Sequence, residues 1–467
     1  MQSESESKKG SYRKAGPRRR ASYQPGTGKE SERREKTGSD AHVCPVGRKC
    51  GGCDYQGMEY ERQLQKKDAH MRFLLKNLVR TIHPIIGMKD PLHYRCKVHA
   101  AFDHDRKGNA ISGIYAKNSH VVVPVDSCMI EDRTADAIVV SIRKLLRSFR
   151  IRTYDEDTGY GLLRHVLVRR GYATGQYLVV LVVASPVFPG KNNFVKALRR
   201  EHPEITSIVL NLNAENTSMV LGERNITIYG PGYITDELCG HRFRISPTSF
   251  YQVNPAQTEI LYGKALEYAA LTGKEEVLDA YCGTGTIGII ASDKAGHVTG
   301  VELNREAVRD AVSNARGEKI RNIDFICGDA GDYLDSLTGG ADNYPHPSAG
   351  NAGHWNSPEE RPARPDVIIM DPPRTGSTET FIRAAASSGA KRIVYVSCGP
   401  DTLARDLKRF TELGYSAAEA QPVDLFPYTQ HTECVALLVR QYDKAKSFVN
   451  VSLDMDEYRR IKSRHRN

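Results

Sequence analysis

The chain has 467 residues, of which 40% are hydrophobic and 26% are charged, and its net charge at pH 7 is +10. This length favours two or three domains, and the composition is that of a soluble protein with hydrophobic cores. No apolar run approaches the roughly 20 residues that a membrane helix needs. The sequence also begins without a hydrophobic signal core, so we expect a cytoplasmic protein with no membrane partner.

The excess of positive charge predicts a polyanionic partner. Half of the excess lies in residues 1–40, which hold eleven Lys and Arg but only six Asp and Glu. RNA or DNA is the first partner to expect for such a chain, although a basic tail can also serve solubility alone. Because this segment is almost free of aliphatic side chains, residues 1–42 are predicted to be a disordered basic tail.

Three of the ten cysteines follow this tail on a short glycine-rich loop. Cys44, Cys50 and Cys53 are too crowded for an accidental core, and in the cytoplasm such thiols stay reduced or bind metal. A set of four thiolates suits zinc or an iron–sulfur cluster. The five-residue gap between Cys44 and Cys50 is wide for zinc, which favours [4Fe–4S]. Spacing leaves the fourth ligand open between Cys96 and Cys128.

Two predicted regions lie between residues 43 and 254. Residues 43–92 hold the cysteine knuckle and a helix at 60–78, and residues 93–254 read as a mixed α+β domain. The elements expected in the second region are a hairpin of strands 94–104 and 110–125, a helix at 135–149, paired strands at 164–171 and 176–184, a helix at 191–200, and strands at 207–212 and 226–229.

Strands and helices then alternate through residues 255–445, which predicts a doubly wound α/β sheet that ends in a strand pair. The expected strands are 276–281, 297–302, 323–327, 366–371, 392–398, 416–423 and 434–440. Residues 339–364 are rich in Pro, Gly and Asn and are predicted to be an inserted surface loop. Residues 446–467 are predicted to be a short basic C-terminal tail.

A glycine motif and three carboxylates point to a nucleotide-like cofactor. Residues 283–288 fit G-x-G-x-x-G after a strand and before a helix, where glycines let a ligand approach the backbone. Glu302 ends the next strand, at the right distance to bind ribose hydroxyls in NAD or S-adenosylmethionine. Asp329, after the third strand, suits an adenine amine, and Asp371, in Asp-Pro-Pro after the fourth, favours the methyl donor.

A thiol and a carboxylate lie further along the same region. Cys398 ends an apolar strand, at the sheet edge where ligands bind. A cysteine there is either inert core or a nucleophile, and a helix N-terminus beyond Pro400 would stabilise its thiolate. Glu433 begins an otherwise apolar strand. It is either exposed at the strand end or a general base whose pKa is raised by partial burial.

Together these motifs resemble the RNA 5-methyluridine methyltransferases, specifically the iron–sulfur branch that acts on 23S ribosomal RNA. The resemblance covers about residues 43–440. It rests on Cys44-Pro45, Cys50-Gly51-Gly52-Cys53, the Thr158–His165 segment, Phe250-Tyr251-Gln252-Val253-Asn254, Asp279 to Gly285, Asp371-Pro372-Pro373-Arg374, Ser397-Cys398-Gly399-Pro400 and His431-Thr432-Glu433-Cys434.

The resemblance implies a class I methyltransferase domain that uses S-adenosylmethionine and a covalent cysteine–uracil adduct. Cys398 would be the nucleophile, Glu433 the general base, and Phe250 a stacking partner of the target base. The implied cofactor ligands are Gln252, Tyr281, Thr286, Glu302, Asp329 and Asp371. The implied ligands of a [4Fe–4S] cluster are Cys44, Cys50, Cys53 and Cys128, a set that includes Cys128 rather than Cys96.

The chain departs from this family in two places. Members often begin with a small RNA-binding β-barrel, whereas only a basic stretch precedes Cys44 here, so RNA docking would rely on that tail and the middle domain. Thr286 also stands where ribosomal members often carry Asn.

The expected partner is 23S ribosomal RNA or a pre-ribosomal particle, bound by a monomer. The alternatives are the same reaction on the T-loop uridine of tRNA, a non-catalytic RNA-binding assembly factor and, less favoured, a Rossmann dehydrogenase.

Overall fold

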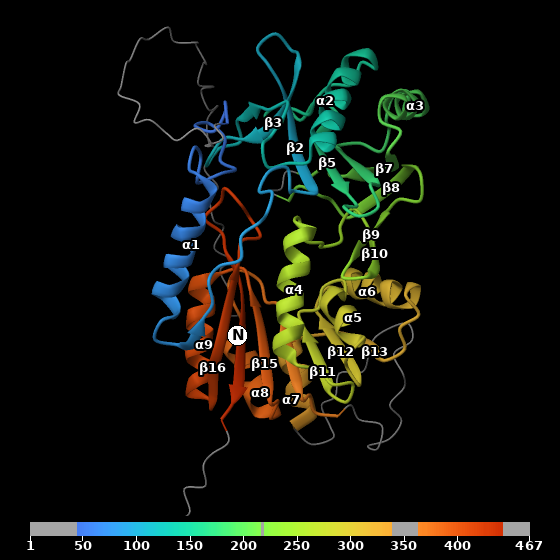
Figure 1. The fold of residues 1–467 in the computed structure, drawn as a ribbon. Helices are drawn as coiled ribbons and strands as arrows, with labels where there is room; N and C mark the ends of the chain where they lie inside the picture. The colour runs from blue at the N-terminus through green and yellow to red at the C-terminus, as the bar shows by residue number, and fades with distance from the viewer. Residues whose placement is uncertain (1–43, 216–218, 339–362, 442–467) are drawn as a thin grey trace, which may run out of the picture. The chain divides into compact units, whose positions relative to one another are not determined.

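The computed structural model describes residues 44–215, 219–338 and 363–441 (Figure 1). These residues form an eight-stranded sheet, a seven-stranded sheet and a two-stranded hairpin. The predicted tails, 1–42 and 446–467, and residues 339–362 of the predicted insertion lie outside the described residues. Among the described helices, none is long and apolar enough to cross a membrane.

The first described elements are helix α1 (Tyr60–Leu75) and strand β1 (Val79–Ile82). Helix α1 buries residues 63, 67, 71 and 75, a spacing of four that puts them on one face. The helix ends before the predicted residue 78 because the chain then extends into β1, which pairs in parallel with β16 at a sheet edge. Sequence analysis missed β1 because it is short and half exposed.

The seven-stranded sheet has the order β4-β3-β2-β5-β6-β7-β8 and is antiparallel except between β6 and β7. Helix α3, which joins those two strands, is the crossover that parallel pairing requires. The elements are β2 (Lys97–His104), β3 (Ala110–Tyr115), β4 (Val122–Pro124), α2 (Arg133–Ser148), β5 (Leu163–Arg170), β6 (Tyr177–Val183), α3 (Lys191–Glu201), β7 (Ile205–Leu212) and β8 (Arg224–Tyr229).

The two faces of this sheet bury different partners. Val179 and Leu181 of β6 pack in the core formed with α2 and α3, whereas the intervening Leu178 and Val180 pack with β9 and β10. The predicted hairpin, the helices and the strand pairs are confirmed. The predicted strand 110–125 is wrong in one respect, because a turn divides it into β3 and β4.

Three elements between the sheets were not predicted. They are β9 (Ile234–Leu238), β10 (His241–Ile245) and α4 (Pro255–Ala269). The β9 and β10 hairpin alternates buried residues with more exposed ones, and its buried residues are apolar except for Asp236 and His241. Its buried side joins the core shared with α4 and the eight-stranded sheet, so only tertiary packing shows why these short strands are stable.

The eight-stranded sheet has the order β1-β16-β17-β15-β14-β11-β12-β13. It is parallel except for β17, which runs antiparallel to both β15 and β16. Its remaining strands are β11 (Glu276–Ala280), β12 (His297–Glu302), β13 (Ile323–Cys327), β14 (Val367–Met370), β15 (Arg392–Ser397), β16 (Tyr415–Val423) and β17 (Glu433–Arg440). The predicted doubly wound sheet with a C-terminal strand pair is thereby confirmed.

Helices cover both faces of this sheet. They are α4, α5 (Thr286–Ser292), α6 (Arg305–Gly317), α7 (Ala330–Thr338), α8 (Glu379–Ser388) and α9 (Pro400–Glu412). One core joins alternate strand residues to α4 and α5, and the other joins the intervening residues to α1, α7, α8 and α9. Figure 1 shows α1 beside α9 and β16, although they lie at opposite ends of the chain.

The strand order places a ligand crevice at β11 and β14. From β11 the chain builds outward through β12 and β13, then returns to β14 on the other side. Such a reversal opens a crevice beyond the carboxyl ends of the strands, where open α/β sheets bind ligands. The glycine motif follows β11 and Asp371 follows β14, so both flank this switch point.

A buried carboxylate on α9 binds residues from β15 and from the segment after β14 near this edge of the sheet. Asp406 is 1% exposed and accepts hydrogen bonds from the Ser377 N–H and the Tyr395 hydroxyl, each at 2.8 Å. We expect Asp406→Ala to lower the free energy of unfolding by about 3 kcal/mol, because it leaves two buried donors without an acceptor. Urea unfolding measures this, with Glu412→Ala, an exposed change on the same helix, as the control. Equal losses in the two variants would contradict the expectation.

Candidate active site

The loop between β11 and α5 carries the glycine motif and has an unusual backbone. Tyr281, Gly283 and Gly285 have positive φ angles of 62°, 55° and 78°. At Gly285 a Cβ atom would also come within 2.7 Å of the Phe325 ring, so glycine is required there. At Gly283 a Cβ atom would meet no atom within 4 Å. The loop therefore leaves open space beside its backbone, as a ligand-binding loop must.

Two carboxylates hold this loop. Asp279, which is 1% exposed, accepts a hydrogen bond from the Gly288 N–H at 2.8 Å, and burial raises the pKa of Asp279 to about 8. Glu302 accepts from the Gly283 N–H at 3.1 Å and, through its other oxygen, from the Asn304 N–H at 2.8 Å. Each carboxylate oxygen has a second lone pair for a further donor, so Glu302 lies beside the glycine loop in a position to bind a ligand.

Asp329 and Tyr281 lie at the same sheet edge and also have partners in the protein. Asp329 follows β13 and accepts hydrogen bonds through Oδ1 from the N–H groups of Gly331 and Asp332, at 2.7 and 3.1 Å. It therefore caps α7. The Tyr281 hydroxyl lies 2.9 Å from the Ser377 hydroxyl. Part of the hydrogen-bonding capacity of both side chains is therefore used in holding the fold.

Gln252 and Thr286 approach this region from two other elements. Thr286 begins α5, and its hydroxyl lies 3.3 Å from that of Thr284. Burial and then the charge of Asp371 raise the pKa of the buried Tyr262 hydroxyl well above its usual value, whereas a hydrogen bond with the Gln252 side chain lowers it. Tyr262 therefore lies close to Gln252 and within reach of the charge of Asp371. Sequence analysis missed Tyr262, because it did not predict the helix that carries this residue.

Cys398, Glu433 and Asp371 come together because of strand direction. β14 and β15 are parallel, so Asp371 and Cys398, which follow them, lie at the same edge. β17 is antiparallel to β15, with Ser397 opposite Cys434. The first residue of β17, Glu433, therefore lies at the edge where β15 ends. One edge of the sheet thus carries a thiol and two carboxylates.

Burial raises the pKa values of all three groups, and neighbouring charges add to the effect on Glu433 and Cys398. Glu433 is 3% exposed, and burial followed by the charge of Asp371 raises its pKa to about 8. Burial raises the pKa of Asp371 to about 7. Burial, then Glu433 and Asp371, raise the pKa of the Cys398 thiol to about 11, while Arg374 acts in the opposite direction. The thiol is therefore protonated at neutral pH, with carboxylates nearby that can exchange protons.

The N-terminus of helix α9 does not determine whether the Cys398 thiol is ionised. Helix α9 begins at Pro400, as predicted, and Gly399 is its N-cap. The dipole of such a helix favours a thiolate, but burial and the neighbouring carboxylates outweigh it, because the pKa of Cys398 rises rather than falls. Attack by this sulfur therefore needs a proton acceptor.

Two exposed residues adjoin this site. Phe250 is 65% exposed, and its carbonyl accepts a hydrogen bond from the Thr284 hydroxyl at 3.3 Å. The exposed Arg374 follows Asp-Pro-Pro, and its charge lowers the pKa values of both Cys398 and Glu433. Sequence analysis gave Arg374 no role, although its place in the Asp-Pro-Pro-Arg segment was a usable signal.

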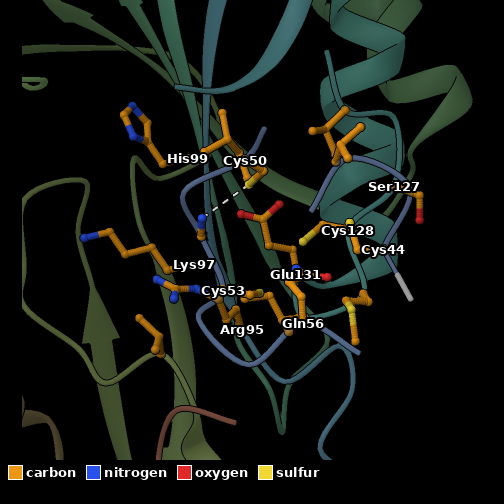
Figure 2. A pocket seen from close by; sticks show the side chains of 17 residues that line it. Cys44, Cys50, Cys53, Gln56, Arg95, Lys97, His99, Ser127, Cys128 and Glu131 are labelled. Atoms are coloured by element: carbon orange, nitrogen blue, oxygen red, sulfur yellow. Dashed lines mark hydrogen bonds between the residues drawn. The ribbon is translucent and has the colours of Figure 1, made fainter. Parts of the chain in front are cut away.

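The cysteine loop lies in a separate cavity of about 310 Å³. Figure 2 shows Cys44, Cys50, Cys53 and Cys128 lining it together with Glu131. Cys96 is not among the lining residues. Its buried thiol instead lies 3.4 Å from the Gln252 carbonyl oxygen.

The four thiols share one environment without converging on a point. Burial, then the neighbouring thiols Cys50 and Cys44, raise the pKa of Cys53 to about 12, and burial raises the pKa of Cys128 to about 12. Across residues 44–215, 219–338 and 363–441, no group of three or more His, Cys, Asp or Glu is placed to hold a metal ion. Four thiols around one cavity are nevertheless a donor set that suits zinc or an iron–sulfur cluster.

The sequence of this chain is similar to those of RNA methyltransferases. The family described as tRNA (Uracil-5-)-methyltransferase matches residues 232–441. A protein from Caldanaerobacter subterraneus subsp. tengcongensis, named "Uncharacterized RNA methyltransferase", is 40% identical over 401 residues, which is 85% of this chain and 84% of that relative. One of the same name from Clostridium tetani is 40% identical over 408 residues, covering 86% of this chain and 84% of the relative.

A solved structure shares the fold. The tRNA (uracil-54, C5)-methyltransferase of Pyrococcus abyssi, in complex with S-adenosyl-L-homocysteine, has a TM-score of 0.66 and 24% identity, and the match covers 84% of this chain and 86% of that one. The fold is therefore that of a Rossmann-like S-adenosylmethionine-dependent methyltransferase. From these sequence matches, the chain belongs to the RNA (uracil-5-)-methyltransferase family.

Proposed function

We propose that this protein forms 5-methyluridine in RNA through a covalent bond between Cys398 and carbon 6 of uracil. The observation that carries the proposal is the meeting of Cys398 and Glu433 at one sheet edge, beside the glycine loop. Carbon 5 of uracil is a poor nucleophile until a bond to carbon 6 makes it electron-rich. A thiol and a buried carboxylate are the groups that such addition and elimination require.

The reaction begins with addition. Cys398 gives its proton to a neighbouring carboxylate as its sulfur bonds to carbon 6, and the electron pair of the 5,6 double bond moves into an enolate. S-adenosylmethionine would supply the methyl group that carbon 5 takes up and would leave as S-adenosylhomocysteine. Glu433 in its ionised form then removes the proton from carbon 5, and the carbon–sulfur bond breaks to restore the double bond. The thiolate of Cys398 takes its proton back from the neighbouring carboxylate, and Glu433 releases the carbon 5 proton to water, so the enzyme is unchanged.

Six residues are proposed to hold the methyl donor. Glu302 would bind the ribose hydroxyls through its remaining lone pairs, Asp329 would bind the adenine amine, and Asp371 would lie where donor and substrate meet. The placement of Glu302 against the Gly283 N–H supports this arrangement. The proposed set is Gln252, Tyr281, Thr286, Glu302, Asp329 and Asp371.

The target uridine must leave its base stack to reach Cys398, at a cost of a few kcal/mol. The exposed ring of Phe250 is proposed to stack on it, and the cation of Arg374 to bind its phosphate or base. Residues 93–254 are proposed as the RNA-binding domain, beside a methyltransferase domain over residues 255–445, in a monomer.

The proposed substrate is 23S ribosomal RNA, with Cys44, Cys50, Cys53 and Cys128 holding a [4Fe–4S] cluster. The four thiols that line one cavity support the cluster, and the cluster in turn supports the ribosomal branch. The mechanism above has no redox step, so the cluster is proposed to be structural or to help dock RNA. The second candidate is the tRNA T-loop uridine, since the fold is shared with an enzyme that acts on tRNA.

The nucleophile and base assignments have different expected signatures. Cys398→Ala should abolish methyl transfer while S-adenosylmethionine and RNA still bind.

Glu433→Gln should accumulate a covalent RNA adduct, because carbon 5 keeps its proton and elimination stops. Methyl transfer and denaturing gels with 23S fragments and tRNA transcripts measure both. Activity in Cys398→Ala, or no adduct in Glu433→Gln, would refute the respective assignment, and methylation of tRNA alone would favour the second substrate.

The rate of adduct resolution should depend on pH. The pKa of Glu433 is raised from 4.5 to about 8, and only its ionised form accepts the proton. Resolution should therefore quicken as pH rises toward about 8 and level off above it. Single-turnover measurements give the profile. A rate that stays constant from about pH 6 to about pH 9 would contradict the role of Glu433 as base.

Metal analysis tests the cysteine site. Protein purified without oxygen should hold about four iron atoms and acid-labile sulfide per chain. Cys53→Ser should lose most of this iron, whereas Cys96→Ala should keep it, because Cys96 lies outside the cavity lining. Bound zinc in place of iron, or iron lost equally in both variants, would overturn the assignment.

A further inference from the structure

The segment that leads into Glu433 is a loop that is mostly buried. Residues 424–432 join β16 to β17, whose facing ends pair as Val423 opposite Glu433. Six of these nine residues are buried. Buried loops are unusual because their backbone N–H and C=O groups need partners. Asn254 and Gln257 donate to two of its carbonyl groups, each at 2.9 Å. Further partners come from the other end of the described chain.

Lys67 of α1 forms hydrogen bonds with both ends of this loop. Its ammonium group donates to Asp424 Oδ1 at 2.6 Å, to the Phe426 carbonyl at 3.0 Å and to the His431 carbonyl at 2.9 Å. Lys67 is 2% exposed and all three of its donors are used. The first residue of the loop and the residue two before Glu433 are therefore joined through one side chain.

Two further residues of α1 bind the same loop. The Tyr60 hydroxyl donates to Asp424 Oδ2 at 2.8 Å, so both oxygens of this buried carboxylate are engaged. Gln63 accepts a hydrogen bond from the Tyr428 N–H at 2.9 Å. These contacts require the segment from Tyr60 to Lys67 to be helical, since only a helix presents these positions on one face.

The cysteine loop, residues 44–55, forms hydrogen bonds with the middle of the same segment. The N–H groups of Asp54 and Tyr55 both donate to the Tyr428 carbonyl at 3.0 Å. The Asp54 carboxylate accepts a hydrogen bond from the Gln430 N–H at 3.0 Å. Tyr428 has a φ angle of 66°, a conformation that costs a non-glycine residue free energy and persists only where its surroundings impose it.

The cysteine cavity and the loop also share a hydrophobic cluster. Tyr428, Tyr94 and Ile130 form its buried centre, and Cys53 and Cys128 pack against them. The Tyr94 hydroxyl donates to the Pro427 carbonyl at 3.0 Å. Two of the four cavity thiols, which Figure 2 shows on either side of Glu131, therefore belong to the packing that holds this loop.

We propose that the cysteine loop and α1 form a brace that positions Glu433, with Asp54 and Lys67 as positioning residues for the proton-removal step. This inference rests on the proposed role of Glu433. Because Glu433 follows the braced loop directly, loosening the loop moves the carboxylate relative to carbon 5 of uracil. Cys398 is carried by β15 and does not depend on the brace. The brace therefore governs the second half of the reaction and leaves the first half intact.

Asp54 offers the cleanest test, because it is exposed and its replacement leaves the core unchanged. Asp54→Ala removes the acceptor of the Gln430 N–H, whereas Asp54→Asn keeps an acceptor oxygen and removes only the charge. Glu61→Ala, an exposed acidic residue of α1, is the matched control. Hydrogen–deuterium exchange over residues 424–432 reports the loop without any need for catalysis.

Two RNA substrates separate the two halves of the reaction. RNA with 5-fluorouridine traps the adduct after methyl transfer, since carbon 5 then carries no proton to remove, and so reports adduct formation alone. RNA with ordinary uridine reports resolution of the adduct. In Asp54→Ala we expect loop exchange to quicken and adduct resolution to slow, each by about tenfold, the worth of one hydrogen bond, while adduct formation stays within about twofold of wild type. Asp54→Asn should lie close to wild type.

Loop exchange and resolution in Asp54→Ala equal to those in Glu61→Ala would overturn the brace. A matching loss of adduct formation would also overturn it, because general loosening affects both halves. If wild-type protein forms no adduct with either RNA, the proposed function fails instead, and exchange over residues 424–432 still decides whether Asp54 holds the loop. Lys67→Met, which removes three contacts at once, should exceed Asp54→Ala in its effect on exchange, and a smaller effect would count against the brace.

Discussion

The antiparallel insertion of β17 between β15 and β16 is the constraint on which the site depends. In a fully parallel sheet the amino end of β17 would lie at the opposite edge from the carboxyl end of β15. Reversal of this one strand brings Glu433 to the edge that carries Cys398, with Ser397 opposite Cys434 in the register. The glycine loop and Asp371 reach the same edge by the ordinary rule for parallel strands.

Burial then gives these groups their chemistry. A carboxylate that loses water is harder to ionise, and the raised pKa values of Glu433 and Asp371 follow mainly from this effect. The same desolvation, with two carboxylates nearby, keeps the Cys398 thiol protonated at rest. The site thus favours neutral groups that exchange protons over a permanent thiolate, and this suits a reaction in which sulfur must both bond to a ring and leave it.

The N-terminal part of the described chain completes the catalytic sheet. β1 extends that sheet beside β16, α1 covers one face, and the cysteine loop binds the segment before Glu433. Lys67 and Asp424 form a fully buried pair that would be costly without the additional carbonyl acceptors around Lys67. Residues some 360 positions apart in sequence therefore form one structural unit, and the cysteine cavity is joined to the proposed base through it.

Sequence alone determined the local features, namely the seven strands from residue 276 onward and the glycine motif, because periodicity and motif spacing are properties of neighbouring residues. It also indicated Cys398, Glu433 and the cysteine group as candidate site residues. It did not show β1, the β9 and β10 hairpin, the partners of Lys67, or the burial and neighbouring carboxylates that raise the pKa of the Cys398 thiol. Tertiary structure decided these points, since edge-strand pairing, burial and the charge felt by a thiol depend on residues that are distant in the chain and adjacent only after folding.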